Sequence, residues 1–167
     1  MNTSSRGRVF VIDYGLGGLT GARELQALAP ELAVDYAADS GFFPYGDKSD
    51  ELLQMRLPQV AKALCQVGRP DVFVIACNTA STLALSEVRA VLDIPVVGTV
   101  PAIKPAAAIT RTGTIGLLAT PGTIQRAYTS RLIEEFASDV RVILHGTVAL
   151  VRMAEQIASG EAIALDA

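Results

Sequence analysis

Residues 72–82 read Val-Phe-Val-Ile-Ala-Cys-Asn-Thr-Ala-Ser-Thr, and this stretch decides the fold. Its first five residues form an apolar run rich in β-branched side chains, which is typical of a buried parallel strand. The run stops at Cys77, and residues 80–92 have the composition of a helix. Cys77 is therefore expected at the carboxyl end of a strand and just ahead of a helix, where ligands bind in open α/β sheets.

This placement gives Cys77 two interpretations. Unpaired N–H groups and the helix dipole favour an anion at a helix start, so the sequence predicts a thiol pKa lowered toward neutrality and a cysteine that acts as base or nucleophile. The alternative is a buried structural cysteine, because free cysteine is among the most buried residue types. Cys65, the other cysteine, falls inside an expected helix and is interpreted as core packing. Two cysteines predict no disulfide framework.

Two further segments resemble the Cys77 segment in their layout. Residues 11–18 place Asp13 at the end of an apolar run, ahead of a glycine-rich turn, and residues 38–48 contain the turn Pro44-Tyr45-Gly46 after another short apolar run. Parallel strands would bring all three loops to one edge of the sheet. Taken singly, Asp13 reads as a turn-capping residue, and Asn78 and Thr79 read as helix caps. Their joint occurrence at strand ends favours a functional site.

The whole chain alternates strands and helices joined by short loops, which predicts a doubly wound α/β fold with a mostly parallel sheet. Residues 9–18 and 114–123 both show a strand, a loop of small residues and a helix start, a weak internal repeat. The expected strands are 9–12, 32–37, 72–76, 94–97, 114–118 and 140–144. The expected helices are 18–29, 49–68, 80–92, a turn and helix over 100–108, 124–137 and 149–158, with residues 119–123 as a loop.

Together with residues 95–105 and 118–123, these motifs occur in the order found in glutamate racemases, and the chain resembles that family over residues 9–155. The family consists of cofactor-independent enzymes of the aspartate/glutamate racemase superfamily. The resemblance implies two similar α/β domains that face each other across the active site. It places the first domain at 1–98, carrying Cys77, and an incomplete second domain at 99–167.

Removal of the α-proton of an amino acid requires a base of suitable pKa and donors aimed at the developing charge on the carboxylate. Cys77 can be that base, and Asp13 can accept from the substrate ammonium or assist proton movement at the thiol. The resemblance implies that Cys77 is one of two catalytic cysteines. It also implies that Tyr45, Gly46, Asn78 and Thr79 contact the substrate. Asp13 and Tyr14 are further substrate-binding candidates, and Thr120 and Thr123, from the facing half, are candidates for the rim of the site. No metal and no cofactor are expected.

The chain departs from the family pattern in two ways. The family has a second cysteine followed by threonine and histidine, and no Cys-Thr-His follows Cys77 here. The chain is therefore expected to be an amino-terminal fragment, or a protein that has lost the reaction, and to be inactive alone. The ending 160–167 looks like the middle of a helix, which favours the fragment. The second departure is Tyr14, where the family has serine.

The leading hypothesis is interconversion of L- and D-glutamate for peptidoglycan precursors. The alternatives are a one-cysteine decarboxylase or isomerase of a small dicarboxylate, and a non-catalytic dicarboxylate-binding protein. A net charge of −3, with no cluster of Lys and Arg, argues against a nucleic-acid partner. No apolar run approaches the ~20 residues of a membrane span, and no signal-peptide core is apparent. A cytoplasmic protein is expected, with a homodimer as the default.

Overall fold

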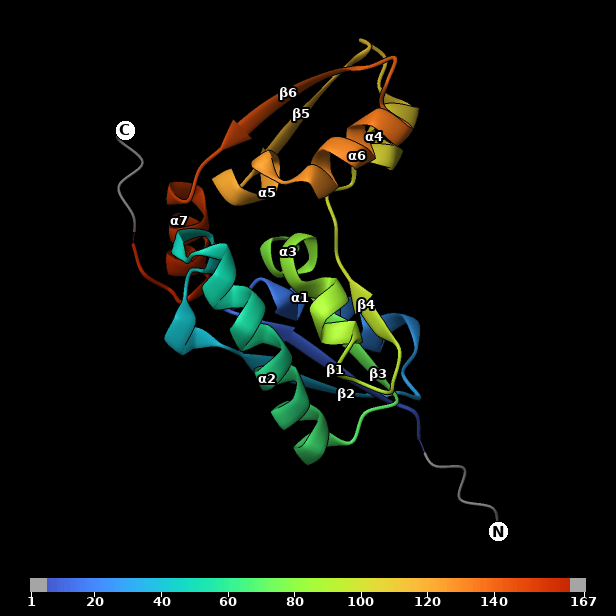
Figure 1. Ribbon diagram of the computed structural model, residues 1–167, viewed down its shortest axis with the longest axis vertical. Coiled ribbons are helices and arrows are strands. Elements are labelled where there is room, and N and C mark those ends of the chain that lie inside the picture. The colour runs from blue at the N-terminus through green and yellow to red at the C-terminus, as the bar shows by residue number, and fades with distance from the viewer. Residues whose placement is uncertain (1–5, 163–167) are drawn as a thin grey trace. The chain divides into compact units, whose positions relative to one another are not determined.

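The structure is a computed structural model that describes residues 6–162. The chain divides into two compact units, the first ending at Thr99 (Figure 1). The first unit contains β1 (Arg8–Asp13), α1 (Gly18–Leu28), β2 (Ala33–Ala38), the 3-10 helices η1 (Ser40–Phe42) and η2 (Tyr45–Asp47), α2 (Asp50–Gly68), β3 (Val72–Ile75), α3 (Asn78–Arg89) and β4 (Val96–Gly98). The second contains α4 (Ile103–Ile109), β5 (Thr114–Ala119), α5 (Pro121–Gln125), α6 (Ala127–Phe136), β6 (Arg141–Gly146) and α7 (Ala149–Ala158).

The first unit is a four-stranded parallel sheet with helices on both faces. The strand order is β2-β1-β3-β4. Phe10 and Ile12 of β1 pack in one apolar cluster with residues of α2 and α3, whereas Val9 and Val11 pack in a second cluster with α1. This alternation follows from the two-residue period of a strand. The predicted α/β class with a parallel, doubly wound sheet is confirmed.

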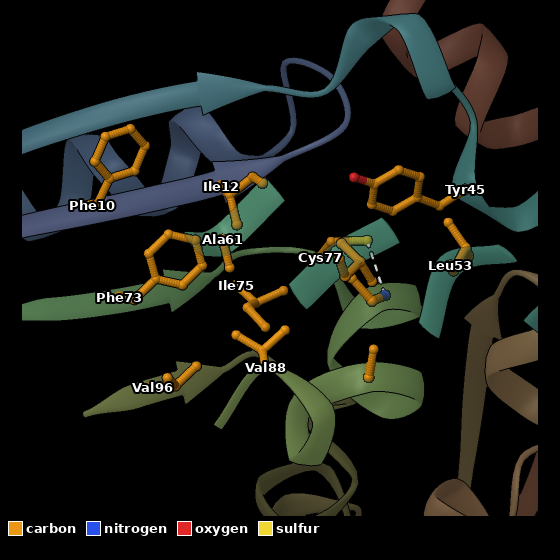
Figure 2. Packing of buried hydrophobic residues seen from close by; sticks show 13 residues of the cluster. Phe10, Ile12, Tyr45, Leu53, Ala61, Phe73, Ile75, Cys77, Val88 and Val96 are labelled. Carbon is orange, nitrogen blue, oxygen red and sulfur yellow. Dashed lines mark hydrogen bonds between the residues drawn. The ribbon is translucent and has the colours of Figure 1, made fainter. Parts of the chain in front are cut away.

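The larger of the two clusters lies between the sheet and the helices α2 and α3 (Figure 2). Phe10 and Phe73 stack with their ring centroids 6.0 Å apart, and Phe73 and Leu53 are completely buried. The cluster continues to the carboxyl ends of the strands, where it includes Tyr45 and Cys77. The apolar core therefore reaches the sheet edge at which the sequence predicts a site.

The second unit pairs β5 and β6 in parallel, with Leu117 opposite Leu144. The loop predicted at 119–123 is partly wrong, because α5 begins at Pro121. Thr120 has an extended backbone, and Pro121 occupies the first helical position, which proline favours. The single helix predicted over 124–137 is likewise two helices, because Arg126 is extended (φ −74°, ψ 143°) and separates α5 from α6.

The expectation that residues 160–167 continue a helix is wrong where it can be assessed. The helix α7 ends at Ala158, and residues 160–162 are not helical. The remaining residues of that expectation, 163–167, lie outside the described residues. Within residues 6–162, none of the helices is long and apolar enough to cross a lipid bilayer.

Candidate active site

The strand order places the candidate site at a topological switch point. The chain runs from β1 to β2 on one side and later places β3 on the other side of β1. In doubly wound sheets such a reversal opens a crevice at the carboxyl ends of the two central strands. Ile12 of β1 lies opposite Ile75 of β3, and the Ala76 N–H donates to the Ile12 carbonyl at 2.8 Å. Asp13 is the last residue of β1 and Cys77 follows the end of β3, so the two residues lie at the same edge of the sheet.

Cys77 occupies the N-cap position of α3. Its backbone is extended (φ −119°, ψ 121°), and its sulfur accepts from the Ala80 N–H at 3.4 Å. The side chain is 5% exposed and belongs to the apolar cluster (Figure 2). Sequence reasoning correctly expected a strand end and a helix start, but α3 already begins at Asn78.

The predicted lowering of the Cys77 pKa is wrong for this structure. Burial raises the pKa of the Cys77 thiol, and the negative charge of Asp13 raises it further. The N–H groups of Ala80 and Thr79 act in the opposite direction, as the helix-start argument anticipated, but they are outweighed. Cys77 is therefore a protonated thiol near neutral pH in this state.

Asp13 caps the glycine-rich turn, as one interpretation of the sequence expected, and its role toward a substrate stays a prediction. Asp13 is 6% exposed, and its carboxylate accepts from the backbone N–H groups of Tyr14 at 2.8 Å and Gly18 at 2.7 Å. These bonds fix the glycine-rich turn at the start of α1. Its negative charge lies close enough to the Cys77 thiol to raise the pKa of that thiol. Asp13 is thus a turn-capping residue whose charge acts on the candidate base.

Asn78 and Thr79 form the first turn of α3. Asn78 is exposed, and its carbonyl accepts from the Thr82 hydroxyl at 2.8 Å. Thr79 is 3% exposed. The two residues are directly next to the thiol in the chain, so their N–H groups and side chains can reach a ligand at this helix start. Their contact with a substrate stays a prediction.

Tyr45 and Gly46 lie in η2, and the Tyr45 side chain is 1% exposed. The pKa of Tyr45 is raised, chiefly by burial and then by its hydrogen bond to Asp39. Tyr14 is half-buried and packs against two rings, Tyr45 at 4.9 Å and Phe43 at 5.7 Å between centroids. The predicted site residues Tyr14 and Tyr45 are therefore in direct contact.

Sequence reasoning missed Asp39 and Arg56. The Asp39 carboxylate accepts from the Tyr45 hydroxyl at 2.8 Å and from two guanidinium nitrogens of Arg56, Nε at 2.7 Å and NH2 at 2.6 Å. Asp39 follows β2 directly, which was a signal of the same kind as that for Asp13. Arg56 lies inside α2 without any pattern that distinguishes it from other charged helical residues.

Thr120 and Thr123 belong to the second unit. Their hydroxyl oxygens lie 3.0 Å apart, and the Thr129 hydroxyl donates to the Thr123 carbonyl at 2.5 Å. All three side chains are buried. The participation of Thr120 and Thr123 in a site with Cys77 stays a prediction. Within residues 6–162, no group of three or more His, Cys, Asp or Glu side chains is placed to hold a metal ion.

The fold and the site define an α/β protein with a buried thiol next to a carboxylate at a sheet switch point. Residues 21–164 match the family described as Asp/Glu/Hydantoin racemase, and the chain belongs to this family. Among its relatives, the glutamate racemase of Serratia proteamaculans (strain 568) is 46% identical over 166 residues, which are 98% of this chain and 58% of that protein. The glutamate racemase of Agrobacterium fabrum is 49% identical over 160 residues, 95% of this chain and 59% of that protein.

Solved structures agree with these relatives. The crystal structure of Escherichia coli glutamate racemase in complex with L-glutamate and the activator UDP-MurNAc-Ala matches with a TM-score of 0.91 and 43% identity, over 96% of this chain and 60% of that chain. Glutamate racemase isoform RacE1 of Bacillus anthracis matches with a TM-score of 0.77 and 31% identity, over 92% and 59%. The chain thus spans about three-fifths of the length of these relatives.

Proposed function

We propose that this chain carries one catalytic face of a cofactor-independent glutamate racemase, which interconverts L- and D-glutamate by proton transfer at the α-carbon. The observation that carries this proposal is the buried Cys77 thiol at the N-cap of α3, next to the carboxylate of Asp13 on the neighbouring strand, at the switch point of the sheet. The glutamate racemases at 46% and 49% identity support glutamate as the substrate. MurNAc is a sugar of peptidoglycan, so the activator of the Escherichia coli relative supports a role in supplying peptidoglycan precursors.

In the proposed reaction, the Cys77 thiolate takes the α-proton and leaves a carbanion that is delocalised into the substrate carboxylate. N–H groups at the start of α3, with Thr79, stabilise the developing charge. Protonation from the opposite face inverts the configuration and requires a second acid. The family resemblance assigns that step to a second cysteine, and no cysteine follows Cys77 in the sequence.

The protonated state of Cys77 sets a condition on this mechanism. The charge of Asp13 is the second cause, after burial, that raises the pKa of the thiol. An amino-acid ammonium bound to Asp13 would offset that charge and so lower the Cys77 pKa. The substrate would then help to generate the base that attacks it. Tyr14, Tyr45, Gly46, Asn78, Thr79, Thr120 and Thr123 are the proposed further contacts to substrate.

The test is exchange of the glutamate α-proton in deuterated water, followed by proton NMR with the full gene product. We expect Cys77→Ala to abolish exchange. Cys65→Ala is the matched control, because Cys65 is half-buried in α2 and packs against the core, and it should keep exchange. Near-normal exchange in Cys77→Ala would refute the assignment. Loss of carbon dioxide from a dicarboxylate would favour a decarboxylase. Binding of glutamate by the unsubstituted protein, without exchange of its α-proton, would favour a binding protein.

The remaining proposals concern the setting of the reaction. A cytoplasmic location is proposed, and the nucleotide-linked activator of the Escherichia coli relative supports it. A homodimer is proposed as the default state of such enzymes. Light scattering of the purified gene product tests the dimer directly, since a monomer mass would contradict it.

A further inference from the structure

A partly buried ion pair in the first unit is hydrogen-bonded to the Tyr45 side chain. Asp39 follows β2, Tyr45 lies in η2 and Arg56 lies in α2. Arg56 binds both oxygens of the Asp39 carboxylate, at 2.7 Å and 2.6 Å, in the bidentate geometry that gives the strongest pairs. The Asp39 side chain is 9% exposed and that of Arg56 is 31% exposed, so solvent screens the pair only partly.

The ion pair also fixes the direction of the Tyr45 hydroxyl. The Arg56 hydrogen bonds hold the pKa of Asp39 below its usual range, so Asp39 stays ionised and can only accept hydrogen bonds near neutral pH. The Tyr45 hydroxyl must therefore donate to it, as it does at 2.8 Å. One Asp39 oxygen, Oδ2, receives both this bond and the bond from Arg56 Nε.

The same arginine ties the loop before Tyr45 to α2. The Arg56 guanidinium carbon lies 3.5 Å from the centroid of the Phe42 ring, a cation–π contact. The loop over residues 39–47 is thus anchored at Phe42 and at Tyr45 by a single side chain of α2 and its carboxylate partner. Tyr45 in turn belongs to the apolar cluster that contains Cys77 (Figure 2), and, after burial and Asp39, the charge of an ionised Cys77 contributes to the raised pKa of Tyr45.

We propose that Asp39 and Arg56 are positioning residues that hold the Tyr45 ring in the apolar cluster that buries the Cys77 thiol, and so set the shape and burial of the site. This inference rests on the proposed function insofar as Cys77 is the catalytic base. Neither positioning residue contacts the thiol as a partner in the proton transfer, and their effect passes through Tyr45. Loosening the pair should therefore expose Cys77 while the rest of the first unit stays folded.

The first test measures the alkylation rate of each cysteine by iodoacetamide, read by peptide mass spectrometry on the 167-residue chain. Asp39→Ala and Arg56→Met should each accelerate alkylation of Cys77 at least fivefold. Arg56→Lys should fall between them and the parent, because lysine cannot make the bidentate contact. Cys65 serves as an internal control, since its rate should stay unchanged. Asp35→Ala is the matched control variant. Asp35 in β2 forms an exposed ion pair with Arg8 in β1, with 3.4 Å between the carboxylate oxygen and the guanidinium nitrogen.

A double-substitution experiment distinguishes positioning from general loosening. Tyr45→Phe removes the hydroxyl through which Asp39 acts, so adding Asp39→Ala in that background should change the Cys77 rate less than twofold. Full additivity, or equal acceleration of Cys65, would overturn the proposal. An unchanged Cys77 rate in Asp39→Ala and in Arg56→Lys would also overturn it. Circular dichroism identifies any unfolded variant, and Arg56→Lys then decides the outcome alone.

The second test uses the full gene product with glutamate. Asp39→Ala should raise the KM for glutamate at least tenfold. In a Tyr45→Phe background, the same substitution should raise KM much less. If the parent shows no exchange with glutamate, the proposed function fails, but the alkylation rates still decide whether the ion pair positions Tyr45. If the parent is active and KM is unchanged in Asp39→Ala, the positioning proposal fails alone.

Discussion

Gly18 is the residue at which a single methyl group should disturb the candidate site most directly. It is the buried first residue of α1, and its N–H donates to Asp13 at 2.7 Å. A Cβ at this position would lie 2.7 Å from the Cβ of Asp13 and 3.0 Å from the Cε2 of Tyr36. Favourable carbon contacts lie at about 3.5–4.0 Å, so the start of α1 would have to move by roughly 1 Å. That movement would break the bond to the carboxylate.

The expected cost follows from three contributions. Overpacking costs about 1–3 kcal/mol, and the weakened hydrogen bond to a charged group costs up to about 1.5–3 kcal/mol. Replacing glycine by alanine in a helix returns about 1 kcal/mol. We therefore expect Gly18→Ala to lower the free energy of unfolding by about 1.5–5 kcal/mol. Gly21→Ala is the matched control in the same helix, because nothing lies within 4 Å of its added Cβ, and it should gain about 0.5–1 kcal/mol.

Urea unfolding followed by far-ultraviolet circular dichroism measures both variants, because the chain has no tryptophan for fluorescence. The two substitutions are chemically identical, so the difference between them reports the close contacts of the added methyl group with Asp13 and Tyr36. Equal stabilities for Gly18→Ala and Gly21→Ala would refute the close-packing argument. Such a result would also mean that α1 can shift without disturbing the turn that holds Asp13.

Two further predictions concern pH and the pocket. The pKa of Cys77 is raised on folding, so its contribution to stability is fully present below the unfolded thiol value of about 8.5 and is lost as the pH rises toward the folded value. The free energy of unfolding measured with urea should therefore fall between about pH 8.5 and 10.5, and it should fall less steeply in Cys77→Ala. Equal slopes of stability against pH in the two proteins would contradict the raised pKa. Tyr14→Ser in the full gene product should bind D-glutamate at least tenfold tighter by calorimetry, about 1.4 kcal/mol, because the Tyr14 ring packs on Tyr45 beside the thiol. Equal affinities would show that Tyr14 does not obstruct the pocket.

The sequence predicted the order of the elements well because that order depends on local patterns. The helix α7 spans Ala149–Ala158, as expected, and β1 differs from the expected strand by one residue at each end. The break at Arg126 was missed, since an extended residue between two helical segments leaves no apolar signature. The predicted residues at the ends of β1 and β3 lie together because the two strands are parallel neighbours, with Ile12 opposite Ile75. Arg56 could not be found, because its role depends on a contact with Asp39, seventeen residues away in the chain.

The thiol of Cys77 shows most clearly why a local argument about reactivity can fail. The helix-start argument counts N–H donors, and the structure contains them, because the Ala80 and Thr79 groups both act to lower the Cys77 pKa. It does not count burial in the apolar cluster or the approach of Asp13 from the neighbouring strand. Both arise from the sheet, since the switch point that gathers ligand-binding groups also brings a carboxylate to the thiol. The arrangement that makes Cys77 a candidate base therefore also keeps it protonated until a positive charge reaches Asp13. An amino-acid substrate carries such a charge on the ammonium group bonded to the carbon from which the proposed reaction removes a proton.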